Sequence, residues 1–359
     1  MRQRDAELLE RTLELAERGR RTASPNPVVG CLIARDGRTL GEGWHLRPGE
    51  LHAEANALAA CTEDPRGATA YVSLEPCSHH GRQPPCADAL IAAGIERVVC
   101  AIGDPSPKVA GAGFARLAEA GVVVELAEGE IVERARRQNA AFRVHSVTGR
   151  PFVLLKLAAS LDGRTATVSG GSRWISSPES RRLVHEWRAS FDAVAIGSGT
   201  ALADDPHLLA RDCDPACERQ PVRVVFDRRA RLSAGSRLAT SVGDGPVLRV
   251  APRGAAPPPP GVEGLAAATL GAALAALGAR GITSLLVEGG ATLASALIAG
   301  GLVDALALFS APLLIGGDGV PLLASLGIGE LSHAPALRRL EVRRVGDDVL
   351  AEGLLRELP

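Results

Sequence analysis

Two short segments of the chain carry side chains that together fit one metal ion. His52-Ala53-Glu54 offers an imidazole and a carboxylate, and the segment from Glu75 to Cys86 offers two thiols, those of Cys77 and Cys86. Zinc that takes part in catalysis usually holds three protein ligands and leaves a fourth position for water. His52, Cys77 and Cys86 supply that number, and Glu54 is left over to move protons. The fold has to bring these two segments together at one point.

The spacing of these residues is close to the zinc deaminase signature, H-x-E followed by P-C-x-x-C. Pro76 precedes Cys77 as the signature requires, but eight residues rather than two separate Cys77 from Cys86. The longer spacing means either that the chain does not carry the deaminase signature or that it belongs to a subfamily with a longer spacing. A helix expected from Leu51 to Cys61 turns about 100° per residue and would point His52 and Glu54 to different sides. That geometry suits Glu54 as a proton carrier rather than as a second ligand.

Two other interpretations of the same residues stay open. The four side chains could be a partly buried histidine, a helix-surface glutamate and two free thiols. A bound zinc ion could also be a structural staple, although structural zinc sites normally have four protein ligands. The combination of these residues on a strand, a turn and a helix favours zinc chemistry over both.

Composition limits the class of protein. A chain of 359 residues with 46% hydrophobic and 23% charged residues suits two globular domains. The formal net charge of −1 gives no indication of nucleic-acid binding. The first residues are charged and lack the apolar core of a signal sequence, and no apolar run approaches the ~20 residues that span a bilayer. An odd number of cysteines, seven, argues against a disulfide framework, so we expect a cytoplasmic protein with no membrane partner.

Strands and helices alternate along the chain, which indicates an α/β architecture with helices covering a central sheet. The first half predicts a helix over 5–18, strands over 28–34, 40–44 and 71–74, and a helix opened by Pro84-Pro85 that carries Cys86 in its first turn. Polar and turn-forming residues from Ser146 to Pro151 follow a helix expected to end near Phe142. We therefore predict two domains, residues 1–146 and 150–359.

The second half contains no G-x-G-x-x-G, so the usual dinucleotide-binding motif is absent. Its elements are a helix over 178–189, strands over 193–196, 222–227, 284–287, 303–309 and 349–355, and a helix over 270–279. Val287-Glu288-Gly289-Gly290 predicts a strand that feeds a glycine turn and a further helix. The amino-terminal end of such a helix presents N–H groups and a positive dipole to a phosphate. A close contact between helix and strand explains the two glycines equally well.

At several places the chain resembles the bifunctional riboflavin-biosynthesis deaminase/reductase family. The widened gap from Pro76 to Cys86 nearly reproduces that family's second metal motif, with Gln83 where threonine is usual. The stretches 24–30, 43–45 and 104–111 are similar to the family as well, and so are 156–163, 171–176 and 204–208 in the second half. The resemblance implies that Asn26 lines a pyrimidine pocket, with His45 and His79 near it. A turn-capping role between two prolines is the alternative for Asn26.

The resemblance also implies a fold and two cofactors. The first half would be a cytidine-deaminase-like three-layer domain that binds Zn²⁺ through His52, Cys77 and Cys86, with Glu54 as the catalytic residue. The second half would be a dihydrofolate-reductase-like domain that binds NADPH. The implied NADPH contacts are Ala158, Trp174, Thr200, Asp204, Gly290, Ala291, Thr292, Leu293, Ala294, Ser295 and Ala296. The implied substrate contacts of the second half are Lys156, Ser172, Arg188, Leu208, Arg211 and Glu288.

Two reactions follow from this resemblance. The first is hydrolytic deamination of 2,5-diamino-6-ribosylamino-4(3H)-pyrimidinone 5′-phosphate, and the second is NADPH-dependent reduction of the ribosyl group to a ribityl chain. The main rival is a zinc deaminase of a nucleoside or a tRNA base whose second half is a binding module. The expected partner is a small-molecule pyrimidine ribosyl phosphate, and the apolar second half could support a homo-oligomer.

Overall fold

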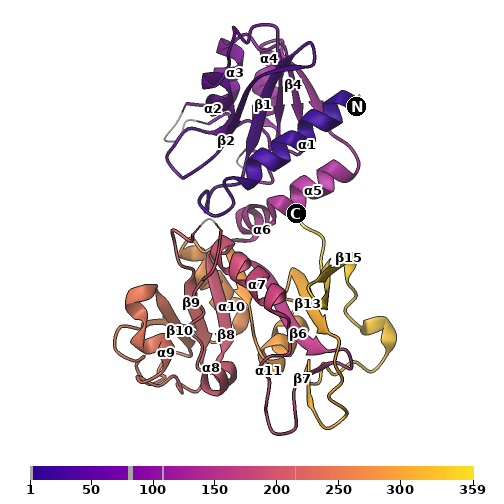
Figure 1. Ribbon diagram of the computed structural model, residues 1–359. Helices are drawn as coiled ribbons and strands as arrows, with labels where there is room; N and C mark the ends of the chain where they lie inside the picture. Colours follow the sequence, from indigo (N-terminus) through magenta and orange to yellow (C-terminus); the bar gives the residue numbers. More distant parts are fainter. Residues whose placement is uncertain (1–2, 80–83, 107–108, 215) are drawn as a thin grey trace. The chain divides into compact units, whose positions relative to one another are not determined.

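The computed structural model describes residues 3–79, 84–106, 109–214 and 216–359. It divides into two compact units, the first formed by Met1–Gly149 with Leu358–Pro359 and the second by Arg150–Glu357. Each unit is built on its own sheet (Figure 1). The helix expected to end near Phe142 runs on to Thr148 and stops at Gly149, which has a left-handed backbone conformation at φ 71°. In the described part of the chain, no helix combines the length and the apolar character that a bilayer span requires.

The first unit has three layers. Its five-stranded sheet has the order β2-β1-β3-β4-β5, with β1 antiparallel to both neighbours and β3, β4 and β5 parallel. Apolar side chains of α2, α3 and α4 cover one face, and those of α1 and α5 cover the other. The strands are β1 (Gly30–Arg35), β2 (Arg38–Trp44), β3 (Thr69–Val72), β4 (Arg97–Cys100) and β5 (Val123–Leu126). The helices are α1 (Gln3–Glu17), α2 (Ala53–Ala59), α3 (Cys86–Ala92), α4 (Ala112–Glu119), α5 (Glu130–Gln138) and α6 (Ala140–Thr148).

Close packing of α2 on β2 places the segment that carries His52 and Glu54. A Cβ atom added to Gly43 would lie 2.3 Å from the backbone nitrogen of Ala57 and 2.4 Å from the carbonyl oxygen of Ala53. Only glycine leaves room for the helix backbone at this distance from the strand. The side chain of Glu54, in the first turn of α2, is held within the unit at 3% exposure.

The second unit carries a nine-stranded sheet of order β11-β10-β9-β8-β12-β6-β13-β16-β15. The strands from β11 to β13 run parallel, and β16 and β15 add an antiparallel edge. Helices α10 and α11 pack on one face, while α7, α8 and α9 lie against the other. The main-sheet strands are β6 (Phe152–Ser160), β8 (Ala193–Gly197), β9 (Val222–Phe226), β10 (Val247–Ala251), β11 (Glu263–Ala266), β12 (Ser284–Val287), β13 (Ala305–Ala311), β15 (Arg338–Val345) and β16 (Asp348–Leu354).

Three helices of the second unit begin at a capping side chain, which explains where they start. Ser177 accepts a hydrogen bond from the backbone of Ser180, Ser236 from Ala239 and Thr269 from Ala272, so three helices begin at a hydroxyl side chain. The remaining elements are α7 (Pro178–Ser190), α8 (Ser198–Asp204), α9 (Arg237–Thr240), α10 (Leu270–Ala279), α11 (Ala291–Ala299), the 3₁₀ turns η1 (Val242–Asp244) and η2 (Leu331–His333), and the two-stranded sheet of β7 (Arg164–Ala166) and β14 (Val320–Pro321).

Candidate active sites

The three predicted metal ligands of the first unit lie together. His52 Nδ1 is 3.3 Å from Cys86 Sγ and 3.6 Å from Cys77 Sγ, and all three ligand atoms lie within 4.8 Å of one another. Tetrahedral zinc with ordinary bond lengths places a nitrogen and a sulfur ligand about 3.6 Å apart. The donor set and its spacing therefore fit zinc, with Nδ1 as the imidazole atom that faces the ion. Among the described residues, no other group of three or more histidine, cysteine or acidic side chains lies close enough together to share an ion.

Local structure explains how the three ligands meet. His52 stands at the residue before α2 with an extended backbone, φ −73° and ψ 167°, so it is not part of the helix. The helical angle predicted between His52 and Glu54 is therefore wrong, because only Glu54 follows helical geometry. Cys77 lies in the turn after β3, and Cys86 opens α3 behind Pro85 as predicted. The backbone N–H of Cys86 donates to Cys77 Sγ at 3.4 Å, which ties the two sulfur atoms together. Gln83 lies outside the described residues.

Electrostatics prepares both a thiolate and a proton carrier. A hydrogen bond from the side-chain thiol of Cys86 is the main cause that lowers the pKa of Cys77, to about 4, and this favours the thiolate, the form that binds metal. The same contact raises the pKa of Cys86. Burial, followed by the negative charge of Cys77, raises the pKa of Glu54 to about 7. A carboxyl group poised near neutrality can both accept and donate a proton at that pH.

A cavity of about 850 Å³ opens beside the three ligands. Asn26, His45 and His79 line it together with His52 and Glu54, so the three residues expected near a pyrimidine all reach it. The other lining residues are Pro25, Pro27, Val29, Pro48, Gly49, Glu50, Leu74, Glu75, Cys77, Asp104, Ser106, Val109, Phe142 and Ser146.

The imidazole of His45 fixes the orientation of the Asn26 amide. His45 Nδ1 lies 3.2 Å from the carbonyl oxygen of Leu51, which can only accept, so Nδ1 carries the hydrogen. Burial lowers the pKa of His45 and keeps the ring neutral. Nε2 is then an acceptor, and it takes a hydrogen bond from Asn26 Nδ2 at 3.0 Å. The amide nitrogen of Asn26 therefore bonds to a side chain of the cavity wall and does not cap the turn between the two prolines.

Glu75 is a part of this site that the sequence pattern did not single out. Its carboxylate is 4% exposed and accepts backbone hydrogen bonds from Asp104 at 3.0 Å, Gly111 at 3.1 Å and Gly113 at 2.9 Å. These three bonds hold the loop that brings Asp104 to the cavity wall. The position of Glu75 directly before Pro76-Cys77 was the available signal, but a glutamate after a strand is usually exposed to solvent.

In the second unit, two helices begin side by side at the carboxyl ends of β8 and β12, which are parallel neighbours in the sheet. A Cβ added to Gly290 would lie 3.2 Å from Thr200 Oγ1, so two predicted NADPH contacts from α8 and α11 touch. Gly197, the residue before α8, would meet Leu293 at 3.5 Å in the same way. A crevice at the carboxyl ends of parallel strands, with helix N-termini facing it, is the usual place for a nucleotide phosphate in such folds.

Not every residue of the predicted NADPH turn reaches the surface. Thr292 and Ala296 are exposed, and Ala291 and Leu293 are partly exposed. Ala294 belongs to the core, and Ser295 is 5% exposed and donates to the carbonyl oxygen of Ala324. The inner side of α11 faces the sheet, and for that reason the structure does not bring these two side chains to a ligand.

The predicted NADPH contacts Trp174 and Asp204 lie near each other at the surface. The indole of Trp174 is 68% exposed, and the guanidinium of Arg181 stacks on it 4.6 Å from the ring centre. Arg173 donates to the carbonyl oxygen of Asp204 at 2.6 Å, so the segment that carries Ser172 and Trp174 is tied to the end of α8. At this exposure the indole of Trp174 is not part of the core.

A charged cluster joins three predicted substrate contacts. Arg188 Nε and Nη2 donate to the two carboxylate oxygens of Glu288 at 2.6 Å and 2.9 Å, and both side chains are nearly buried. This pairing lowers the pKa of Glu288 against the opposing effect of burial. The guanidinium of Arg188, a predicted substrate contact, is thus paired with the carboxylate of Glu288.

Lys156 belongs to the same cluster. It lies inside β6, on the face of the strand that also presents Ala158, and its Nζ is 5.5 Å from the ring centre of Phe309. Burial lowers the pKa of Lys156. Lys156 is therefore not a solvated side chain at a strand end, because it lies in mid-strand and interacts electrostatically with Glu288 and Arg188.

The loop that carries the last two predicted substrate contacts is held by side chains. Arg211 is exposed, and its backbone N–H donates to His185 Nδ1 at 3.1 Å. Leu208 adopts a left-handed backbone at φ 59°, and its side chain lies in the core at 3% exposure. The structure therefore leaves Leu208 only its backbone for a ligand.

Comparisons with known proteins cover both units of the chain. Residues 2–102 match the family model described as the cytidine and deoxycytidylate deaminase zinc-binding region, and residues 151–351 match that of the RibD C-terminal domain. The riboflavin biosynthesis protein RibD of Escherichia coli is 44% identical over 96% of this chain and 98% of its own, and that of Haemophilus influenzae is 39% identical over 96% of each.

Solved structures extend the likeness to the whole fold. The Acinetobacter baumannii RibD structure, form 1, has a TM-score of 0.88 at 37% identity and covers 98% of both chains. A Thermotoga maritima diaminohydroxyphosphoribosylaminopyrimidine deaminase/5-amino-6-(5-phosphoribosylamino)uracil reductase has a TM-score of 0.87 at 34% identity, covering 97% of this chain and 98% of its own. The predicted fold class, a deaminase-like unit followed by a reductase unit, is confirmed. The chain belongs to the RibD family of bifunctional riboflavin-biosynthesis proteins.

Proposed function

We propose that the first unit deaminates 2,5-diamino-6-ribosylamino-4(3H)-pyrimidinone 5′-phosphate and that the second unit reduces the ribosyl group of the product to a ribityl chain with NADPH. The observation that carries the proposal is the group of His52, Cys77 and Cys86, with their ligand atoms within 4.8 Å, beside the buried carboxylate of Glu54. A relative whose name states both activities, the Thermotoga maritima protein, matches 97% of the chain.

In the first reaction the chain's own residues bind the ring and move a proton. His52, Cys77 and Cys86 would hold Zn²⁺, which when bound supplies Lewis acidity for the hydrolysis. Asn26, oriented by His45, would hydrogen-bond the pyrimidine edge. Glu54 takes a proton from the attacking water and delivers it to the departing amino group, which leaves as ammonia, and its pKa of about 7 suits both transfers.

In the second reaction the chain chiefly binds and orients. Gly290 to Leu293, with Thr200, would hold the phosphates of NADPH, which when bound supplies the hydride for the sugar carbon C1′. Trp174, Ala158 and Asp204 would make further cofactor contacts. Ser172, Leu208 and Arg211 would contact the substrate. The charged group of Lys156, Arg188 and Glu288 would contact its ribosyl phosphate.

The experiment that tests the proposal follows both reactions in one chain. We expect one ammonia released per diaminopyrimidine phosphate consumed, followed by oxidation of one NADPH. Glu54→Ala should abolish most ammonia release while the chain still binds zinc, because Glu54 is not a ligand. Undiminished ammonia release by Glu54→Ala would support a purely structural zinc site. Ammonia release without NADPH oxidation would favour the rival, a deaminase with a binding module.

The small-molecule pyrimidine partner fits an enzyme of this family. The lack of a nucleic-acid or membrane partner, the cytoplasmic location and a homo-oligomer formed through the second unit stay predictions. Light scattering of the purified chain measures the oligomeric state directly.

A further inference from the structure

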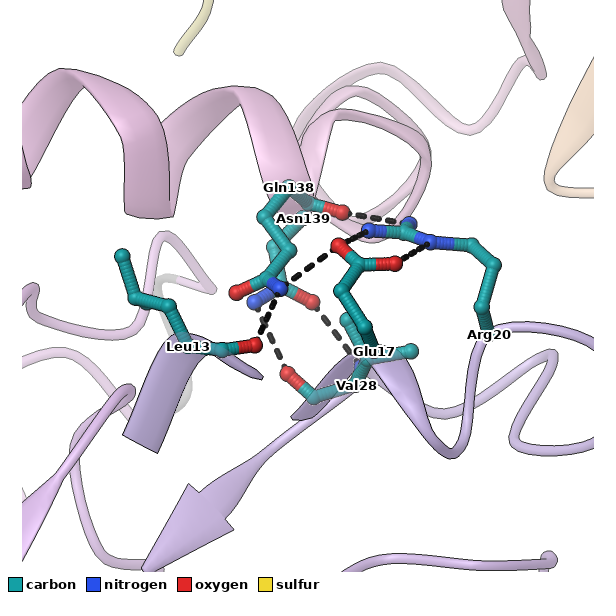
Figure 2. Close-up of polar contacts among 6 residues, drawn as sticks. All are labelled: Leu13, Glu17, Arg20, Val28, Gln138 and Asn139. Carbon is teal, nitrogen blue, oxygen red and sulfur yellow. Dashed lines mark hydrogen bonds and ion pairs between the residues drawn. The ribbon is translucent and has the colours of Figure 1, made fainter. Parts of the chain in front are cut away.

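Asn139 lies at the junction of α5 and α6 and contacts a residue far from it in sequence. Its Nδ2 donates to the carbonyl oxygen of Val28 at 2.9 Å, and its Oδ1 accepts from the backbone N–H of Val28 at 2.9 Å (Figure 2). The side chain is 2% exposed. Since Val28 offers one donor and one acceptor, this pairing also fixes which end of the Asn139 amide is oxygen and which is nitrogen.

Because its amide bonds to Val28, Asn139 does not cap helix α6, which is the usual role of an asparagine at that position. Asparagine directly before a helix usually accepts a hydrogen bond from the helix backbone, which stabilises the first turn. Asn139 occupies that position before α6 and makes no such bond. Its amide is committed to Val28 instead, so the local need of the helix does not explain the residue.

Val28 lies just before the first strand of the sheet. It directly follows residues 25–27, which line the cavity and are called the pocket loop. The pairing of β1 with β2 begins at Gly30, and the Asn139 amide meets both polar backbone groups of Val28 much as a neighbouring strand would. Asn26 and Val29, on either side of Val28, line the cavity beside the metal ligands. The side chain of Asn139 therefore holds the backbone two residues after Asn26, next to the cavity.

The rest of α6 belongs to the same wall. Phe142 and Ser146 line the cavity, and Arg143 Nη1 donates at 3.1 Å to the carbonyl oxygen of Gly103, next to Asp104. Helix α6 and the residue before it thus contact the segments before β1 and after β4, and residues of both segments line the cavity. Asn139 joins the helix to the loop that carries Asn26.

We propose that Asn139 is a positioning residue for pyrimidine recognition, acting through the backbone of Val28 on Asn26. This inference rests on the proposed deaminase function of the first unit. Without Asn139, the N–H and C=O of Val28 lose their buried partners and the loop moves to find others. Asn26 then meets the ring less well, while the ligands His52, Cys77 and Cys86, which come from other segments, keep their geometry.

The test measures KM and kcat of ammonia release for three variants, with bound zinc determined on the same samples. Asn139→Ala removes both bonds, and Asn139→Asp keeps the acceptor for Val28 N–H but sets a carboxylate oxygen against its carbonyl. Both should raise KM on the order of tenfold while kcat per bound zinc changes little, because the loss concerns substrate placement. Gln138→Ala is the control, since Gln138 bonds to Leu13 and Glu17 and not to the pocket loop, and its KM should stay that of the wild type.

A double variant asks whether Asn139 acts through Asn26. Asn139→Ala should raise KM far less in an Asn26→Ala background than in the wild type, since residues that act through one another are not additive. Reduction of the deaminated substrate by the same samples, which uses the second unit, should be unchanged.

Three results would overturn the inference. Unchanged KM in both Asn139 variants would remove the link to the substrate. Loss of zinc or of kcat at unchanged KM would assign Asn139 to folding alone. Additive effects of Asn26→Ala and Asn139→Ala would show that the two residues act separately. A wild-type chain that releases no ammonia would instead defeat the proposed function itself, and this inference with it.

Discussion

At the scale of single residues, Tyr71 offers a pH-dependent prediction because it is the only tyrosine in the chain. Its hydroxyl donates to Asp5 Oδ1 at 2.7 Å, and Asp5 also pairs with Arg97 at 2.8 Å. Burial and the carboxylate of Asp5 raise the pKa of Tyr71 from 10.0 to about 12. Because the folded-state pKa is raised, the contact stabilises the fold fully below about pH 10 and is lost as the pH rises toward 12.

The ultraviolet absorbance of tyrosinate reports this group alone. We expect the native chain to titrate near 12 and the denatured chain near 10. Asp5→Asn should lower the native value only partway, since burial is the larger cause. A native titration near 10 would contradict the buried contact.

Residues that act through their chemical type were predictable from the sequence, and residues that act through placement were not. The sequence predicted that His52, Cys77 and Cys86 come together near Glu54, because imidazole, thiol and carboxylate groups at that spacing have few other uses, and the structure places them together. Asn139 was not, because a lone asparagine between two polar helices looks like a capping residue until its partner across the chain is known.

At the scale of elements, the close contact between α2 and β2 should decide whether the metal site forms. An alanine Cβ at Gly43 would stand 2.3 Å from the backbone nitrogen of Ala57, so α2 has to shift. The shift carries Glu54 and the adjoining His52 with it. We expect Gly43→Ala to bind less zinc and to release ammonia on the order of a hundredfold more slowly.

The second unit supplies a control for that substitution. A Cβ atom added to Gly243 would have no other atom within 4 Å apart from its chain neighbours, so Gly243→Ala should leave both activities near wild type. Reduction of the deaminated substrate should also be normal in Gly43→Ala. Full zinc content and normal ammonia release in Gly43→Ala would mean that the helix does not set the site.

Elements with clear local signals were predicted well. Helix α10 was placed over 270–279 as observed, since Thr269 caps it and alanine and leucine fill it. Strand β10 (Val247–Ala251) was not predicted, because Arg249 interrupts its apolar run. In the structure Arg249 is 4% exposed and donates to the carbonyl oxygens of Ala256 and Pro257, partners that no local pattern reveals. Strand β15 was missed for a different reason, since nearly all its residues are exposed and carry no alternation.

At the scale of the whole molecule, the two chemistries rest on two separately packed cores. The first unit's clusters draw on α1 to α6, and the second unit's on α7 to α11. In the described residues, the cluster able to hold a metal ion falls in the first unit alone. The charged group of Lys156, Arg188 and Glu288 and the glycine turn at Gly290 lie in the second unit and use no metal ligand among these residues.

Metal removal should therefore separate the two activities. Treating the chain with a strong zinc chelator should stop ammonia release, because in the proposed function His52, Cys77 and Cys86 hold the zinc ion that this reaction alone uses. Oxidation of NADPH with the already deaminated substrate should continue at the untreated rate. Adding Zn²⁺ back should restore ammonia release in the wild type but not in Cys77→Ser, whose hydroxyl is a poor ligand for zinc. If chelation slowed NADPH oxidation to the same extent, the reductase reaction would depend on the metal site, and the assignment of one chemistry to each unit would fail.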